Sequence, residues 1–149
     1  MLGDDADLLE AAAWLHDIGY SPELVKTGFH PLDGARYLRD VHQADPRLCC
    51  LVGQHSCAIL EAEERGLADE LAREFPLGDP KLCDALAYCD MTTTPTGNTV
   101  SVNDRIAEIA KRYGPHDVVT RFIKKAEPQL VSSVERIDKR LHSVLVAAG

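Results

Sequence analysis

Three apolar helical patterns in this sequence each end in a residue that could bind a metal ion. Apolar side chains at positions i, i+3 and i+4 are followed at i+7 by His16, His55 or Asp90, and Asp17 comes directly after His16. Positions with this spacing share one face of a helix, so these side chains should point toward the core. A shared divalent cation would remove the cost of burying a carboxylate there. Imidazole and carboxylate groups together suit Fe, Mn, Zn or Co.

Each of these residues taken alone has a structural explanation. His16 could be a hydrogen-bonded core histidine, and the aspartate after it could belong to the C-terminal turn of its helix. His55 could simply end a helix. Asp90 could pair with Arg36 or Arg105. Taken jointly, the residue types and their spacing favour a metal site.

Composition indicates a single all-α domain. The chain has 149 residues, of which 45% are hydrophobic and only 5% aromatic, and alanine and leucine dominate. This length buries a sizeable core, and this composition favours helices over strands. We expect one domain over residues 1–149, with long C-terminal helices at about 117–147.

Charge and cysteine content narrow the function classes. The formal net charge of −8 argues against binding to a nucleic-acid polymer or to an anionic membrane. No apolar run approaches the roughly 18 residues of a membrane span, and the acidic N-terminal stretch resembles no secretory signal. The five cysteines form no CxxC pair, which favours reduced thiols and a cytoplasmic location.

The helices that must position the ligand-type residues are bounded by capping and breaking residues. Proline at a first helical position and aspartate just before it are typical helix starts, and glycine is a typical stop. The pattern predicts helices at about 5–18, 31–43, 46–55, 56–75 with a division at Gly66, 79–91, 103–113 and 116–149.

The last predicted segment carries an apolar face formed by Leu130, Val134, Ile137, Leu141 and Leu145. We expect the proline at position 128 to kink or divide this segment.

Four stretches together resemble the HD-domain metal-dependent phosphohydrolase superfamily. They are "LHDIG" at 15–19, "HPLDGARYL" from 30, "GQHS" from 53 and "ALAYCDMTTTP" from 85. The spacing is similar to a subgroup with two extra histidines, which includes the bacterial HD hydrolases of dinucleoside polyphosphates. The resemblance covers roughly residues 5–114.

The resemblance implies a ligand set, residue by residue. His16 and Asp17 match the HD doublet, His30 and His55 the extra histidines, and Asp90 the final aspartate. It also implies an all-α helical bundle with one or two divalent ions (Fe, Mn, Zn, Co or Mg). The implied activity is hydrolysis of a phosphate ester or anhydride of a small metabolite, for which a nucleotide is expected.

The sequence departs from the family pattern in two places. The family has another ligand histidine on a helix before the doublet, and no histidine precedes His16 here. Met1 could be an internal start, the chain could be a natural truncation completed by water or a second subunit, or the domain could be degenerate. An exposed apolar strip left by a missing helix would favour a homodimer. Tyr20 stands where many relatives carry lysine.

The implied chemistry assigns further roles. Asp17 is the expected catalytic residue, because its two carboxylate oxygens could bridge two ions. Thr94, Arg105 and Lys26 are candidate contacts to a small phosphorylated substrate. Two alternatives remain open: a catalytically degenerate binding or regulatory module of the same fold, and a helical interaction domain.

Overall fold

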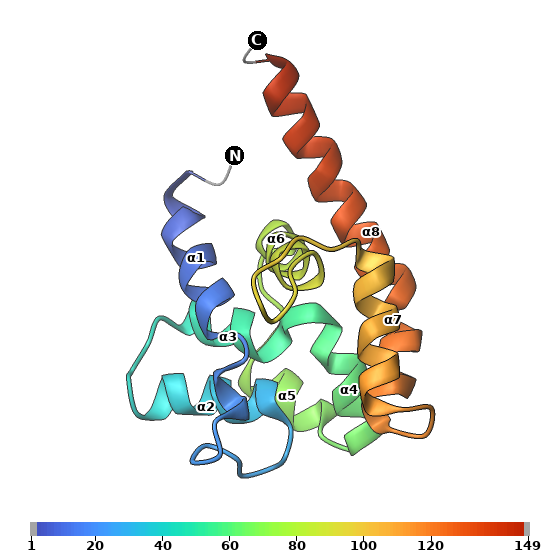
Figure 1. Ribbon diagram of the computed structural model, residues 1–149. Coiled ribbons are helices and arrows are strands. Elements are labelled where there is room, and N and C mark those ends of the chain that lie inside the picture. Colours follow the sequence, from blue (N-terminus) through green and yellow to red (C-terminus); the bar gives the residue numbers. More distant parts are fainter. Residues whose placement is uncertain (1–2, 148–149) are drawn as a thin grey trace.

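The protein is built from helices throughout the part of the chain that the structure describes. This computed structural model describes residues 3–147, in which an isolated bridge between Thr93 and Thr99 is the only β-type pairing. The all-α class is therefore confirmed (Figure 1). The elements are η1 Gly3–Asp5, α1 Ala6–Leu15, η2 Ile18–Tyr20, α2 His30–Asp40, α3 Pro46–Gln54, η3 His55–Cys57, α4 Ala58–Arg65, α5 Ala68–Glu74, α6 Pro80–Met91, α7 Val102–Tyr113 and α8 Val118–Ala147.

Several helices begin where their capping residues predict. The Asp45 carboxylate accepts a hydrogen bond from the Arg47 amide at the start of α3. Asp79 does the same for the Lys81 amide at the start of α6. A proline follows each cap, at a position whose missing N–H costs the helix nothing. The helix predicted from about 103 begins at 102, after the cap Ser101.

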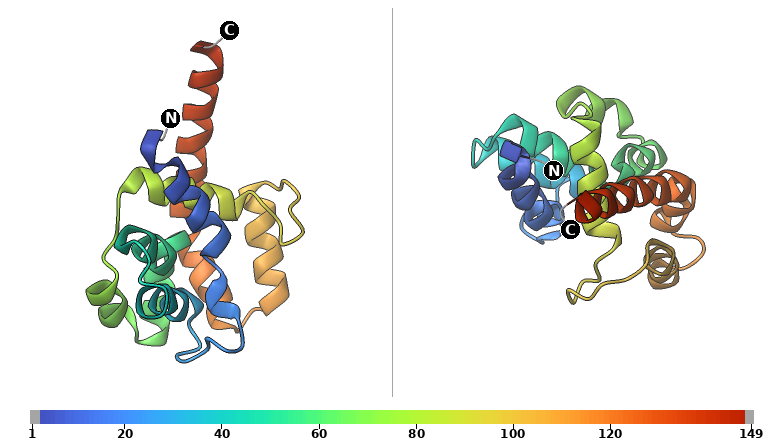
Figure 2. Two further views of the ribbon diagram at one scale, coloured as in Figure 1. Left: turned by 90° about the vertical axis from the view of Figure 1, so that its left-hand side faces the viewer. Right: turned by 90° about the horizontal axis from the view of Figure 1, so that it is seen from above.

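Two hydrophobic clusters lie on opposite sides of α6. The first includes Phe29, Val52 and Phe75 and is shared by α1 to α6, and the second includes Met91 and Phe122 and is shared by α6 to α8. Figures 1 and 2 show α6 crossing the middle of the molecule between these two groups of helices. The residues at the carboxyl end of α6 therefore lie where the two halves of the core meet.

The C-terminal segment forms one continuous helix. Pro128 does not divide this segment, because α8 runs unbroken from Val118 to Ala147 with the proline inside it, and the alternative of a kink stays a prediction. Phe122 and Leu130, on either side of it, are both buried, and their packing offsets the roughly 3 kcal/mol cost of an internal proline. The predicted apolar face is buried as far as Ile137, whereas Leu145 is 71% exposed where α8 projects beyond the body (Figure 2).

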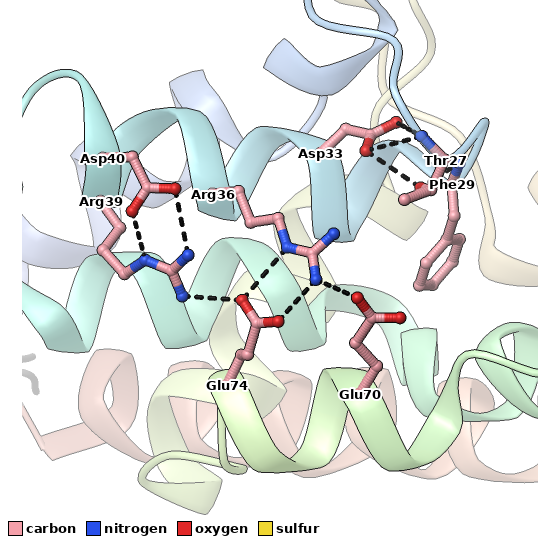
Figure 3. A network of polar contacts seen from close by, with 8 residues as sticks. All are labelled: Thr27, Phe29, Asp33, Arg36, Arg39, Asp40, Glu70 and Glu74. Carbon is pink, nitrogen blue, oxygen red and sulfur yellow. Dashed lines mark hydrogen bonds and ion pairs between the residues drawn. The ribbon is translucent and has the colours of Figure 1, made fainter.

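An ion-pair network joins α2 to α5. The Arg36 guanidinium bonds to Glu70 and to Glu74, and Arg39 Nη1 lies 2.8 Å from Glu74 Oε2 (Figure 3). Arg36 is thus not the partner of Asp90 that one alternative allowed. The network holds α5 under α2, the helix that begins with His30.

None of the helices in the described residues is long and apolar enough to cross a membrane.

Candidate metal centre and its pockets

The turn after α1 is held against α2 by two glycines. The first helix ends at Leu15 rather than at about 18, and residues 18–20 form η2. A Cβ on Gly19 would lie 2.0 Å from the carbonyl oxygen of His30, and one on Gly34 would lie 3.0 Å from the Gly19 nitrogen. Only glycine permits this approach of two backbones. It places Asp17, two residues before Gly19, beside the first residue of α2.

A buried carboxylate organises the loop that leads into His30. Asp33 is 3% exposed, and it accepts hydrogen bonds from the backbone amides of Lys26, Thr27 and Gly28 and from the Thr27 hydroxyl. Figure 3 shows the bonds from Thr27. These bonds satisfy amides that precede the helix and fold the loop back onto the first turn of α2. The chain therefore reaches His30 along a fixed path.

His55 lies at a strained turn between α3 and α4. Ser56 and Cys57 have φ values of +46° and +62°, a left-handed conformation that costs non-glycine residues about 1–3 kcal/mol each. In this conformation the Ser56 hydroxyl donates to Asp90 Oδ2 at 2.5 Å. The turn thus presents a serine to the carboxyl end of α6 directly after His55.

Two imidazoles have their Nδ1 atoms engaged by the backbone. His55 Nδ1 lies 2.7 Å from the Val52 carbonyl oxygen, and His16 Nδ1 lies 2.9 Å from that of Ala13. In a neutral imidazole, a hydrogen bond from Nδ1–H leaves Nε2 as the free lone pair, which is the arrangement of a metal-ligating histidine.

The ligand-type atoms form two groups that share Asp17. On one side, Asp17 Oδ1 lies 3.3 Å from His30 Nε2 and 3.9 Å from His55 Nε2, and the two imidazole nitrogens are 3.2 Å apart. On the other side, His16 Nε2 lies 3.5 Å from Asp17 Oδ2 and 3.7 Å from Asp90 Oδ1. The structure therefore brings together all five residues predicted as metal ligands.

The two sides of the group differ in protonation. Burial lowers the pKa of His55 to about 4, assisted by the neighbouring His30 and His16. Burial also opposes a charge on His16, but Asp90 and Asp17 outweigh it and raise the pKa of His16 to about 9. The same contact holds the pKa of Asp90 well below its usual range, against the effect of burial. His55 is therefore a neutral imidazole at pH 7, whereas His16 and Asp90 form an ion pair.

The chemistry of the donor set fits a divalent cation. Asp17, His30 and His55 each offer one atom, and these atoms lie within 4.8 Å of one another. Three N and O donors from different elements, with a backbone bond fixing the orientation of the His55 ring, match the requirements of a transition-metal site. Protonated His16 balances the negative charges of Asp17 and Asp90, and a bound cation would do the same at this place.

Two pockets meet at these residues. The larger has a volume of about 350 Å³ and the smaller about 290 Å³, and both are lined by Asp17, Asp90, Pro95 and Arg105. Arg105 is 8% exposed and bonds through Nη1 to Glu108, while its Nε has no hydrogen-bond partner among the described residues. A buried guanidinium with an unsatisfied N–H beside the ligand carboxylates could bind an anion there.

Of the other two predicted substrate contacts, one lies in a pocket and one does not. Thr94 lines the smaller pocket, and its hydroxyl is engaged within its own loop by Thr96 and the Asn98 amide. Lys26 is exposed and lines neither pocket, since its loop folds toward Asp33 instead.

Other pocket residues were not predicted from the sequence. Arg112 and Tyr113 of α7 line the larger pocket together with Tyr20 of η2 and His30 of α2. The seven-residue spacing between Arg105 and Arg112 on one helix was the available signal. Tyr20, noted only as a departure from the family, stacks on the His30 ring with centroids 3.9 Å apart and planes at 14°.

Comparison with known families identifies the family of this chain. A family model described as HD domain matches residues 1–113. The chain belongs to the HD domain family. No curated protein and no solved structure gives a significant match. HD domains bind divalent metals and are typically metal-dependent phosphohydrolases, which agrees with the Asp/His/His group formed just before η2, at the start of α2 and just after α3.

Proposed function

We propose that this HD domain is a phosphohydrolase that cleaves a phosphate ester or anhydride of a small metabolite, with a nucleotide as the expected substrate. The observation that carries the proposal is the position of the five ligand-type residues, at the boundary of two pockets and beside the buried Arg105 guanidinium. Pockets of about 300 Å³ and above suit small organic ligands.

The residues present would hold one or two divalent ions. Asp17 Oδ1 with His30 and His55 would form one set of ligands, and Asp17 Oδ2 with His16 and Asp90 the other. When bound, such ions activate water at neutral pH and neutralise phosphoryl oxygens. Asp17 would be the shared carboxylate of both sets, which is the reason to assign it the central catalytic role.

The chain's own groups would hold and orient the substrate. Arg105 would donate to phosphoryl oxygens, and its burial strengthens such a contact by excluding water. In the reaction, the oxygen of water bonds to phosphorus while the bond from phosphorus to the leaving oxygen breaks. One proton from water goes to the leaving oxygen, and the other is released from the new phosphate at neutral pH.

Hydrolysis of nucleoside monophosphates, followed by phosphate release, and of dinucleoside polyphosphates, followed by chromatography of the nucleotide products, tests the proposal when measured with Mn²⁺ and with excess chelator. We expect metal-dependent hydrolysis that Arg105→Gln weakens, mainly through a higher KM. Arg121→Gln is the matched control, since Arg121 is exposed, pairs with Glu64 and lines neither pocket. Equal activity with and without metal would contradict the proposal. Metal binding without hydrolysis of either class would favour the alternative, a non-catalytic binding module.

A further inference from the structure

The larger pocket extends from the ligand residues to a wall of apolar side chains. These side chains come from α4, α6, α7 and α8, and they are Ala58, Met91, Ile109, Val119, Phe122 and Ile123. Each belongs to, or packs against, the hydrophobic clusters of the core, so the wall is firm rather than adaptable.

Much of the polar lining of this pocket is already engaged within the protein. Glu61 Oε1 accepts from Arg65 at 2.6 Å, and the Ser56 hydroxyl donates to Asp90. Arg112 is bound through Nε and Nη2 to the Glu108 carboxylate. A hydroxyl-rich ligand would have to break these bonds or leave its own hydroxyls unpaired, and each unpaired buried group carries a penalty.

The wall also includes residues outside the matched part of the family. The HD-domain match ends at residue 113, whereas Val119, Phe122 and Ile123 lie on α8. The shape and polarity of this part of the pocket are therefore properties of this chain and do not follow from family membership.

We infer that the substrate's organic group is apolar or aromatic and lies against this apolar wall, while its phosphoryl group faces Arg105 and the ligand residues. This inference rests on the proposed function. The substrate class is a phosphate ester that carries such a group, as the base of a nucleotide does, as opposed to the phosphate ester of a sugar or polyol alone. Burial of that group against side chains such as Ile109 and Phe122 supplies the affinity that distinguishes the two classes.

Phosphonates test this inference without turnover, because their carbon–phosphorus bond is not an ester. Titration calorimetry of the Mn²⁺-loaded protein would compare phenylphosphonate with methylphosphonate, which share the anionic group and differ in the organic one. We expect phenylphosphonate to bind at least about tenfold more tightly. Equal affinities, or binding of neither compound, would overturn the inference. If esters are nevertheless hydrolysed in those cases, the proposed function stands and the assigned substrate class fails.

Matched variants locate the effect at the wall. Ile109→Gln places an amide in the pocket and should weaken phenylphosphonate about fivefold to tenfold while leaving methylphosphonate unchanged. Ile59→Gln is the control, since Ile59 is also half-buried but lies outside both pockets. If Ile109→Gln lowers the affinity for both phosphonates equally, or if Ile59→Gln lowers the affinity for phenylphosphonate as much, the phenyl group does not bind at the wall. Thermal unfolding checks that each variant is folded, and the comparison of the two compounds on the unsubstituted chain stands without any variant.

Discussion

Replacing Gly19 with alanine tests how the fold brings the ligand residues together. The new Cβ would lie 2.0 Å from the His30 carbonyl oxygen and 2.8 Å from the Gly34 nitrogen, where ordinary contact begins at 3.4 Å. Both neighbours are backbone atoms of α2, so η2 must move by about 1.4 Å. Asp17 lies two residues before Gly19, with Oδ1 only 3.3 Å from His30 Nε2, and must move as well.

Two magnitudes follow from that displacement. Forced overpacking of this kind costs about 1–3 kcal/mol in the free energy of unfolding. Metal ligands tolerate errors of only about 0.2 Å, so a shift of this size should weaken Mn²⁺ binding at least about 100-fold. The loss of metal affinity should therefore be large relative to the loss of stability.

Chemical denaturation in chelator and calorimetric titration with Mn²⁺ measure the two effects separately. Gly78→Ala is the matched control, because its Cβ would meet no atom within 4 Å and its φ is not in the left-handed region. We expect this variant to be neutral or stabilised by about 0.4–1 kcal/mol, with unchanged metal binding. A Gly19→Ala protein that unfolds and binds Mn²⁺ like the unsubstituted chain would refute the reasoning.

Three further substitutions have defined outcomes. Asp33→Asn should lower the free energy of unfolding by about 1.5–3 kcal/mol, because backbone amides lose a charged acceptor, and a loss under about 0.5 kcal/mol in denaturant titrations would contradict this. Ser56→Ala should weaken Mn²⁺ binding about tenfold in calorimetry, since Asp90 loses its hydroxyl donor; unchanged affinity would show that Asp90 needs no such support. Two arginines lower the pKa of Glu74 to about 2, so this carboxylate stabilises the fold fully above about pH 4.5 and the contribution disappears as pH falls toward 2. Glu74→Gln should therefore lower Tm at pH 7 and converge with the unsubstituted chain near pH 2, whereas a pH-independent difference would rule out this ion pair as the cause.

Local chemistry made several elements predictable. The starts of α3 and α6 follow from Asp45 and Asp79 with the prolines after them, because a cap acts on amides two residues away. The convergence of His16, His55 and Asp90 was predictable from apolar spacing, since each terminates a core-facing stripe. His30 was predicted as a ligand through the family resemblance alone.

Features that depend on tertiary contacts were not predictable in the same way. The close approach of Gly19 to α2 depends on partners eleven and fifteen residues away, His30 and Gly34, and leaves no local pattern. The continuity of α8 through Pro128 depends on buried packing on both sides of the proline, which outweighs its local effect. Arg112 lies at the pocket on α7, whose position is set by its packing on α8. Lys26 lies outside both pockets, because Asp33 holds its loop against the first turn of α2.

The shared role of Asp17 is the centre of this account, and the metal content of purified variants tests it most directly. Elemental analysis would compare the unsubstituted chain with Asp17→Ala, His30→Ala and Asp90→Ala after loading with Mn²⁺ and removal of free ion. We predict that His30→Ala and Asp90→Ala each lose one of two bound ions, whereas Asp17→Ala loses both, because the two oxygens of Asp17 face both groups of ligands. An Asp17→Ala protein that keeps the metal content of the unsubstituted chain would contradict it.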